Sequence, residues 1–199
     1  SKTIIVTVGD EQGRNTQTSF PVVISPPPTG IHTIQGPGST STFEGQLVTT
    51  TGIVTALRSS SFYIQTPDAL VDADPTTSEG LLVFSGFPRA GGFGVGDLVK
   101  VTGTVTEFRP NADPTSPPIT ELTNPVATLV SSGHGLPAPA ALLPAFTQPD
   151  GNQEQLERFE GMRVRADVMA ITGTGAFNQS DAEEREAISV SNGDFFAVI

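Results

Sequence analysis

The stretch VGDLVKVTGTVTEF, residues 95–108, decides the fold of this chain. Val99, Val101 and Val105 fall on one side of an extended backbone, and lysine and threonine residues fall on the other. This alternation predicts a half-buried β-strand rather than a helix. Gly103 stands in the middle, where a glycine weakens a strand unless the strand bends or another backbone approaches closely. The stretch therefore predicts a bent strand, such as the corner of a small barrel requires.

A second stretch, QLVTTTGIVTA at residues 46–56, has the same character and again a central glycine, Gly52. Two long strands of this kind, about fifty residues apart, are what a strongly coiled five-stranded barrel uses. Apolar runs at residues 61–65, 80–84 and 119–130 supply the other three strands. We expect the last of these to be interrupted at Pro125.

The composition favours an all-β chain. Among 199 residues there are 21 glycines and 17 prolines, and long helical periodicities are nearly absent. This balance is typical of strands joined by many turns. No cysteine is present, which excludes disulfides, thiolate metal sites and thiol nucleophiles. Because the chain starts without a methionine and ends within an apolar run, we expect a piece of a longer polypeptide.

The formal net charge of −11 restricts the classes of partner. Binding to a phosphate backbone draws most of its free energy from lysine and arginine side chains that displace counterions. A chain this acidic is therefore a poor non-specific nucleic-acid binder unless its arginines cluster. No apolar run approaches the length of a bilayer span, so we expect no membrane insertion.

The chain divides at a proline-rich segment. The expected parts are a hairpin (residues 1–25), a linker (26–30), a barrel (31–146), and a linker with a truncated second β unit (147–199). Three consecutive prolines make the first linker stiff. We expect the second β unit because FEGMRV at 159–164 echoes FEGQLV at 43–48.

The expected hairpin carries a recognisable pattern. Val6-Thr7-Val8 is followed by Asp10 and Gly13, and then by Phe20 at the start of a second alternating run. The pattern resembles the closing F and G strands of bacterial immunoglobulin-like and cadherin-like surface domains. The resemblance implies that residues 1–25 are the tail of such a domain.

A series of motifs occurs in order along residues 31–165. They are Ile34-Gln35-Gly36, Glu44-Gly45, Gly52-Ile53-Val54-Thr55, Phe62-Tyr63-Ile64-Gln65, Asp74-Pro75-Thr76-Thr77-Ser78-Glu79-Gly80, Val95-Gly96-Asp97-Leu98-Val99, Gly103-Thr104-Val105-Thr106-Glu107, Thr120-Glu121-Leu122 and Leu136-Pro137. In this order they resemble the OB-fold module found upstream of the endonuclease/exonuclease/phosphatase domain in large secreted bacterial nucleases. The resemblance implies a five-stranded OB-type barrel within an all-β fold.

The same resemblance implies a function and a location. It implies a non-catalytic accessory module, secreted or on the bacterial cell surface, which positions nucleic acid or braces the catalytic domain. The catalytic His, Asp and Asn motifs of that nuclease family do not appear in this sequence, so we do not expect the chain itself to be an enzyme. A second hypothesis is a structural spacer or protein-interaction domain without a ligand of its own, which the acidic charge and the Pro/Gly-rich linkers favour.

Aromatic and arginine residues gather around the expected second and third strands. A ligand face there would consist of Arg58, Tyr63, Phe87, Arg89 and Phe93. That face of OB-folds carries ligands, and bases stack on aromatic rings for about 1–3 kcal/mol each. Single-stranded nucleic acid is thus one expected partner, beside neighbouring domains of the same chain. Alternatively, the aromatic rings fill the barrel core, and Tyr63 alone faces outward.

An acidic loop offers oxygen ligands for a metal. Asp72, Asp74 and Glu79 could hold Ca²⁺, and the sequence suggests no other cofactor. The spacing is not that of an EF-hand, because Pro75 follows Asp74 and no glycine stands at the sharp turn. Alternatively, the loop is merely solvated, with Asp74 opening an Asx-Pro turn and Ser78 bonding to nearby backbone.

The two histidines do not indicate catalysis. His32 and His134 stand far apart in the sequence, and no serine or acid is spaced to suggest a triad. Two histidines do not make a zinc site by themselves. We expect both side chains at the surface.

Overall fold

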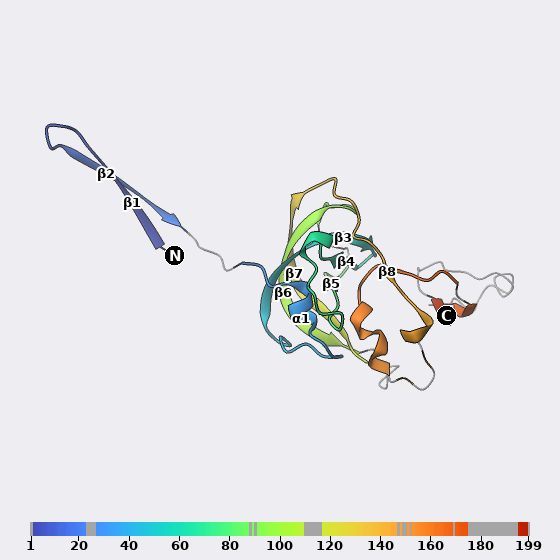
Figure 1. Ribbon diagram of the computed structural model, residues 1–199. Helices are drawn as coiled ribbons and strands as arrows, with labels where there is room; N and C mark the ends of the chain where they lie inside the picture. Colours follow the sequence, from blue (N-terminus) through green and yellow to red (C-terminus); the bar gives the residue numbers. More distant parts are fainter. Residues whose placement is uncertain are drawn as a thin grey trace.

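The computed structural model describes residues 2–22, 27–87, 89, 91–109, 117–146, 148, 151, 153–168, 170–174 and 195–198. Strands dominate the described residues, and five of them form a closed barrel. Figure 1 shows the barrel in the middle of the chain, with smaller strand pairs outside it. The predicted all-β class is confirmed.

The barrel strands are β3 (Leu47–Leu57), β4 (Ser61–Gln65), β5 (Gly80–Phe84), β6 (Leu98–Phe108) and β7 (Ile119–Ser131). They close in the order β3-β4-β5-β7-β6. Neighbours are antiparallel except for β5 and β7, which run parallel. A closed sheet has no free edge on which another chain can add a strand.

The two glycine-bent strands, β3 and β6, lie side by side and pair antiparallel. A β-carbon on Gly52 would lie 3.0 Å from Cβ of Ile64, and one on Gly103 would lie 3.1 Å from Cβ of Leu122. The two glycines therefore allow the close approaches that a coiled barrel needs, as the sequence predicts.

Alternation along the strands fills the interior. On β6, Val99 and Val101 are buried while Lys100 between them is exposed. The other strand residues of the core are Val48, Val54, Phe62, Ile64, Leu81, Val83, Val105 and Leu122. Each large apolar side chain that is fully buried stabilises the fold by about 1.5–3 kcal/mol.

Two separate segments plug the ends of the barrel. At one end, which we call the α1 end, the short helix α1 (Ile31–Gln35) inserts Ile31 and Ile34, each 0% exposed. At the other, the Phe93 end, the loop between β5 and β6 inserts Phe93, whose ring meets that of Phe62 edge-on at 4.8 Å. The sequence does not predict α1, which has no side-chain cap.

Strand β7 runs through Pro125 as one element, but its pairing with β6 skips Asn124 and Pro125, so the predicted interruption is present in the ladder and not in the strand itself. Asn124 adopts a positive φ of 49°, and the register with β6 shifts between Thr102 and Thr104. A bulge of this kind absorbs a proline without ending the strand, because the residue at the bulge need not donate to the ladder.

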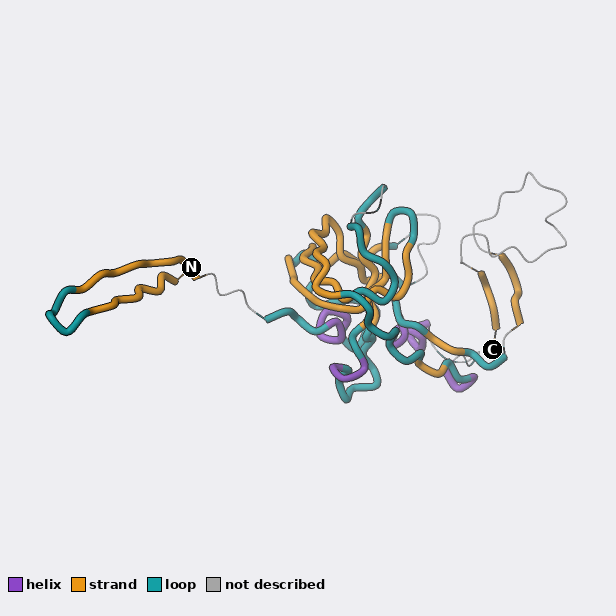
Figure 2. Tube along the Cα trace, turned by 90° about the horizontal axis from the view of Figure 1, so that it is seen from above, coloured by secondary structure: helices purple, strands orange, loops and turns teal. Residues whose placement is uncertain are grey.

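The predicted N-terminal hairpin is present as β1 (Lys2–Gly9) and β2 (Asn15–Val22), which pair antiparallel. Asp10 orders the turn, because its Oδ1 accepts the backbone N–H groups of Gln12 and Arg14. Among the described strands, β1 and β2 pair only with each other. Figures 1 and 2 both show the hairpin apart from the barrel.

Beyond β7 the chain contains short elements only. These are β8 (Ala140–Ala141), η2 (Pro144–Phe146), η3 (Gln153–Phe159), β9 (Val164–Arg165), β10 (Ala170–Thr174) and β11 (Phe195–Val198), where η denotes a 3₁₀ helix. β8 pairs parallel with β9, and β10 pairs antiparallel with β11. The expected second β unit (147–199) is described only in part, since residues 175–194 lie outside the described part, and it stays a prediction.

Candidate functional site

The loop between β4 and β5 brings two of the three predicted metal ligands together. This loop, residues 66–79, contains η1 (Asp68–Leu70) and lies at the α1 end of the barrel. Asp72 and Glu79 meet His32 of α1, and one ligand atom from each lies within 4.8 Å of the others. Asp74, the third predicted ligand, does not belong to this group.

The imidazole of His32 lies between the two carboxylates. Its Nδ1 is 3.3 Å from Glu79 Oε1, 3.4 Å from Glu79 Oε2 and 3.9 Å from Asp72 Oδ2. The Glu79 side chain is only 4% exposed, whereas those of His32 and Asp72 are 24% and 26% exposed. A carboxylate buried this deeply is stabilised by a nearby cation, such as an imidazolium or a metal ion.

Neighbouring groups hold the two carboxylates in place. The backbone N–H of Asp72 donates to Glu79 Oε1 at 2.8 Å, and that of Asp74 donates to Asp72 Oδ1 at 3.0 Å. The hydroxyl of Thr77 donates to Asp72 Oδ2 at 3.2 Å. Outer hydrogen bonds of this kind orient metal ligands, so the loop presents the carboxylates in a fixed geometry.

Asp74 uses its carboxylate to cap its own turn. Its Oδ1 accepts the hydroxyl of Thr76 at 2.6 Å and the backbone N–H of Thr76 at 2.9 Å. The Thr76 hydroxyl, followed by the Thr76 N–H and the charge of Arg158, lowers the pKa of Asp74 below its usual value. This is the Asx turn that the sequence offers as the alternative for this residue.

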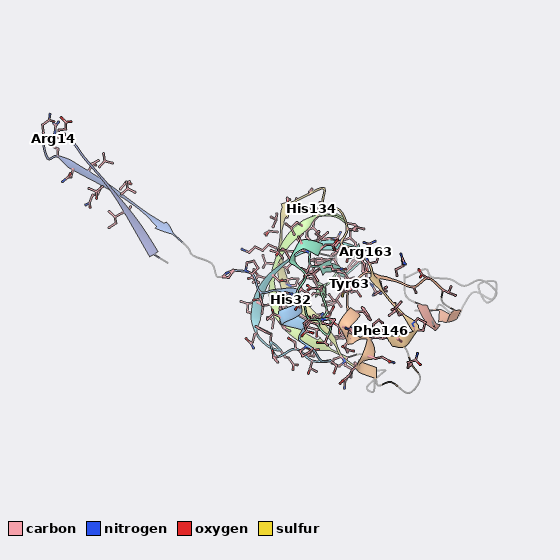
Figure 3. All side chains as sticks on the ribbon, in the orientation of Figure 1. Arg14, His32, Tyr63, His134, Phe146 and Arg163 are labelled. Atoms are coloured by element: carbon pink, nitrogen blue, oxygen red, sulfur yellow. The ribbon has the colours of Figure 1, made fainter. Side chains whose placement is uncertain are left out.

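A pocket of about 490 Å³ opens beside the cluster. Asp72 and Glu79 contribute to one side of it, and Phe146, Arg158 and Phe159 from the C-terminal segment contribute to another. The guanidinium carbon of Arg158 lies 5.0 Å from the ring centroid of Phe146, a cation–π distance. Figure 3 shows Phe146 on the segment beyond the barrel. The pocket thus combines three carboxylates (Asp72, Asp74 and Glu79), one cation and apolar walls.

Residues 159–165, which we call the C-terminal strap, cross the barrel at the α1 end. Glu160 Oε1 accepts the backbone N–H of Thr120 at 2.9 Å and the Gln35 amide at 3.3 Å. The backbone N–H of Arg163 donates to Gln65 Oε1 at 2.9 Å. These bonds tie the strap to α1, β4 and β7 together.

Burial raises the pKa of Glu160 to about 8. Loss of hydration is the largest cause, hydrogen bonds from Gln35 and Thr120 oppose it, and the charges of Glu157 and Glu107 add to it. Burial also raises the pKa of Glu157 and that of Glu121. At pH 7 the Glu160 carboxyl is therefore mostly neutral.

The residues of the predicted ligand face lie at different depths. Phe93 is 5% exposed and belongs to the core, whereas Phe87 is 83% exposed. Tyr63 is half-buried on β4, and Arg58 is exposed at the end of β3. The guanidinium carbon of Arg89 lies 5.5 Å from the ring centroid of Phe93, and its Nη1 is buried without a hydrogen-bond partner among the described residues.

Three of these residues surround one turn. The backbone N–H of Arg89 donates to Ser59 O at 3.0 Å, and that of Arg58 donates to Ser61 O at 2.8 Å. Arg58, Phe87 and Arg89 are therefore gathered at the Phe93 end, away from the strap. Phe84, which is 43% exposed at the end of β5, adds a second exposed ring there.

The two histidines differ in their surroundings. His134 is exposed, as predicted, and its Nε2 lies 2.7 Å from the hydroxyl of Ser131. His32 is half-buried against the carboxylates, so the prediction of a surface position holds for it only in part. Figure 3 shows the two side chains well apart. The isoleucines at 31 and 34, spaced as on one helix face, were the available signal that this segment packs inward.

No protein-family model matches this sequence, and no curated protein matches it. Within the described part of the chain, no helix has both the length and the apolar character that a membrane span requires.

Proposed function

We propose that this chain is a non-catalytic, OB-type barrel module of a secreted or cell-surface nuclease-like protein, where it braces neighbouring domains and contacts single-stranded nucleic acid. The observation that carries the proposal is the closed strand order β3-β4-β5-β7-β6. A five-stranded Greek-key barrel of this kind is the framework of OB-folds, which bind oligonucleotides and oligosaccharides.

The turn at the Phe93 end supports the nucleic-acid contact. Two exposed rings, Phe84 and Phe87, stand near the backbone of Arg58 and Arg89. Exposed aromatic rings stack on bases without sequence preference, for about 1–3 kcal/mol per base. The net charge of −11 weakens the contact with phosphate, so we expect low affinity that depends mainly on stacking.

The bracing role rests on the α1 end. There the strap and α1 are tied to the barrel by buried side-chain bonds of Gln35, Gln65 and Glu160. The chain beyond β7 is therefore anchored to the barrel body rather than joined only through β7. If no nucleic acid binds, the same anchoring suits a structural spacer, which is the second hypothesis.

Fluorescence anisotropy with a labelled single-stranded oligonucleotide tests the proposal. Binding should weaken between about 50 and about 200 mM salt, and Phe87→Ala should weaken it further by removing the more exposed of the two rings. The control is Phe108→Ala, because Phe108 is also an exposed ring, at 47% against 83% for Phe87, and it pairs with Ile119 beside the strap. Absence of binding at the lowest salt, or equal losses in both variants, would reject the nucleic-acid contact.

A further inference from the structure

Beyond the module function, we propose that His32, Asp72 and Glu79 bind one divalent first-row transition-metal ion, with Zn²⁺ the best fit. The three residues come from two parts of the chain that the barrel brings together. α1 supplies the nitrogen ligand, and the loop before β5 supplies the two carboxylates.

The distances fit a shared ion. Two ligand atoms that each lie about 2.1 Å from a tetrahedral ion are about 3.4 Å apart. His32 Nδ1 lies 3.3 Å and 3.4 Å from the two oxygens of Glu79, and 3.9 Å from Asp72 Oδ2. An ordinary N–H···O hydrogen bond is shorter, at about 2.7–3.2 Å. The spacing therefore suits an ion between the groups better than a direct hydrogen bond.

The charges also favour a cation. Two carboxylates meet at this point, and among the described residues the only basic side chain in ion-pair contact with either is His32. A single imidazolium would leave the pair with one uncompensated negative charge, although Glu79 is 4% exposed. A divalent ion bound by a neutral imidazole and two carboxylates leaves no net charge, which lowers the cost of burial.

The ligand set selects the class of metal. Ca²⁺ prefers six to eight oxygen ligands, and Mg²⁺ keeps most of its waters. One imidazole with two carboxylates suits Zn²⁺ and its first-row neighbours. With three protein ligands, a coordination position remains for water or a small anion, and the pocket that Asp72 and Glu79 line has room for it.

Gly30 leaves space for the imidazole. A β-carbon on Gly30 would lie 2.7 Å from both Cε1 and Nε2 of His32. The ring therefore occupies room that only a glycine at this position provides. Gly30→Ala should displace the imidazole of His32 while all three ligand residues remain. It therefore tests whether metal binding depends on the position of the ring.

Isothermal titration calorimetry of the chelator-treated full chain tests the proposal directly. Zn²⁺ should bind with one site per chain, and at least about tenfold more tightly than Ca²⁺ or Mg²⁺. His32→Gln and Asp72→Asn should each weaken Zn²⁺ binding by at least about tenfold, and Gly30→Ala should weaken it too.

The second histidine supplies the matched control. His134→Gln should leave the Zn²⁺ affinity unchanged, since His134 is bonded to Ser131 away from the cluster. Thermal unfolding without metal establishes that each variant folds. If His32→Gln does not fold, Asp72→Asn, at a partly exposed position, takes its place in the test. Absence of Zn²⁺ binding would overturn the proposal. So would a Zn²⁺ affinity that falls in His134→Gln but not in His32→Gln or Asp72→Asn.

Discussion

Glu160 Oε1 accepts the backbone N–H of Thr120 at 2.9 Å across 40 residues of chain. This bond joins the strap to the beginning of β7. The same carboxyl is bonded by the Gln35 amide, whose other bond, at 2.6 Å, runs to the carbonyl of Gly80. The buried Gln35 side chain thus connects α1 to the strap, through Glu160, and to β5, through Gly80.

The stability of the fold should depend on pH through Glu160. Its pKa is raised from 4.5 to about 8 in the folded state, so the folded protein keeps a proton that the unfolded chain releases. The resulting stabilisation is complete below about pH 4.5 and is lost as the pH rises towards 8. Urea unfolding at several pH values should show that the free energy of unfolding falls as the pH rises. In Glu160→Gln this fall should be smaller, and the variant should be more stable than the unsubstituted protein at pH 8. Glu44→Gln, at an exposed position, is the control, and an unchanged pH dependence in Glu160→Gln would contradict the assignment.

The contact between β5 and the strap should not tolerate a methyl group. A β-carbon on Gly80 would lie 2.2 Å from the carbonyl carbon of Gly161 and 2.4 Å from the nitrogen of Met162, both of them backbone atoms. Gly80→Ala should therefore lower the free energy of unfolding by about 1–3 kcal/mol, as overpacking typically does. Gly38→Ala, where a β-carbon meets nothing within 4 Å, should change it little. Equal effects of the two substitutions in urea unfolding would show that the strap does not pack on β5.

Two phenylalanines, Phe62 in the core and Phe87 in the loop after β5, should separate stability from binding. Phe62 is 0% exposed and meets Phe93 in the core, whereas Phe87 is 83% exposed. Phe62→Ala should cost about 3–5 kcal/mol in the free energy of unfolding, while Phe87→Ala should change it by less than about 0.5 kcal/mol. A large loss for Phe87→Ala would mean that its ring is packed rather than available to a ligand.

Much of the barrel is predictable from local pattern, because strand alternation and central glycines are properties of neighbouring residues. The strands around Gly52 and Gly103 are found where the sequence predicts them and pair with each other. The Asx turn at Asp74 is equally local, since it involves a residue only two positions away.

The rest depends on contacts between distant residues. α1 is five residues long and has no side-chain cap, so its stability comes from inserting Ile31 and Ile34 into the barrel. His32 meets Glu79 across 47 residues, and no spacing in the sequence marks that encounter. The function, the location and the identity of neighbouring domains stay predictions, which rest on the resemblance of the sequence motifs.

Closure of the barrel through β5 and β7 is the feature on which the proposed OB-type module depends most. In the register of this parallel pair, Leu82 faces Glu121 and Val83 faces Leu122. Nuclear Overhauser contacts between amide protons of one strand and α-protons of the other measure this pairing directly. The structure predicts such contacts at both pairs, together with slow amide exchange along β5. Their absence, with β5 amides exchanging as quickly as those of a free strand edge, would contradict the closed barrel.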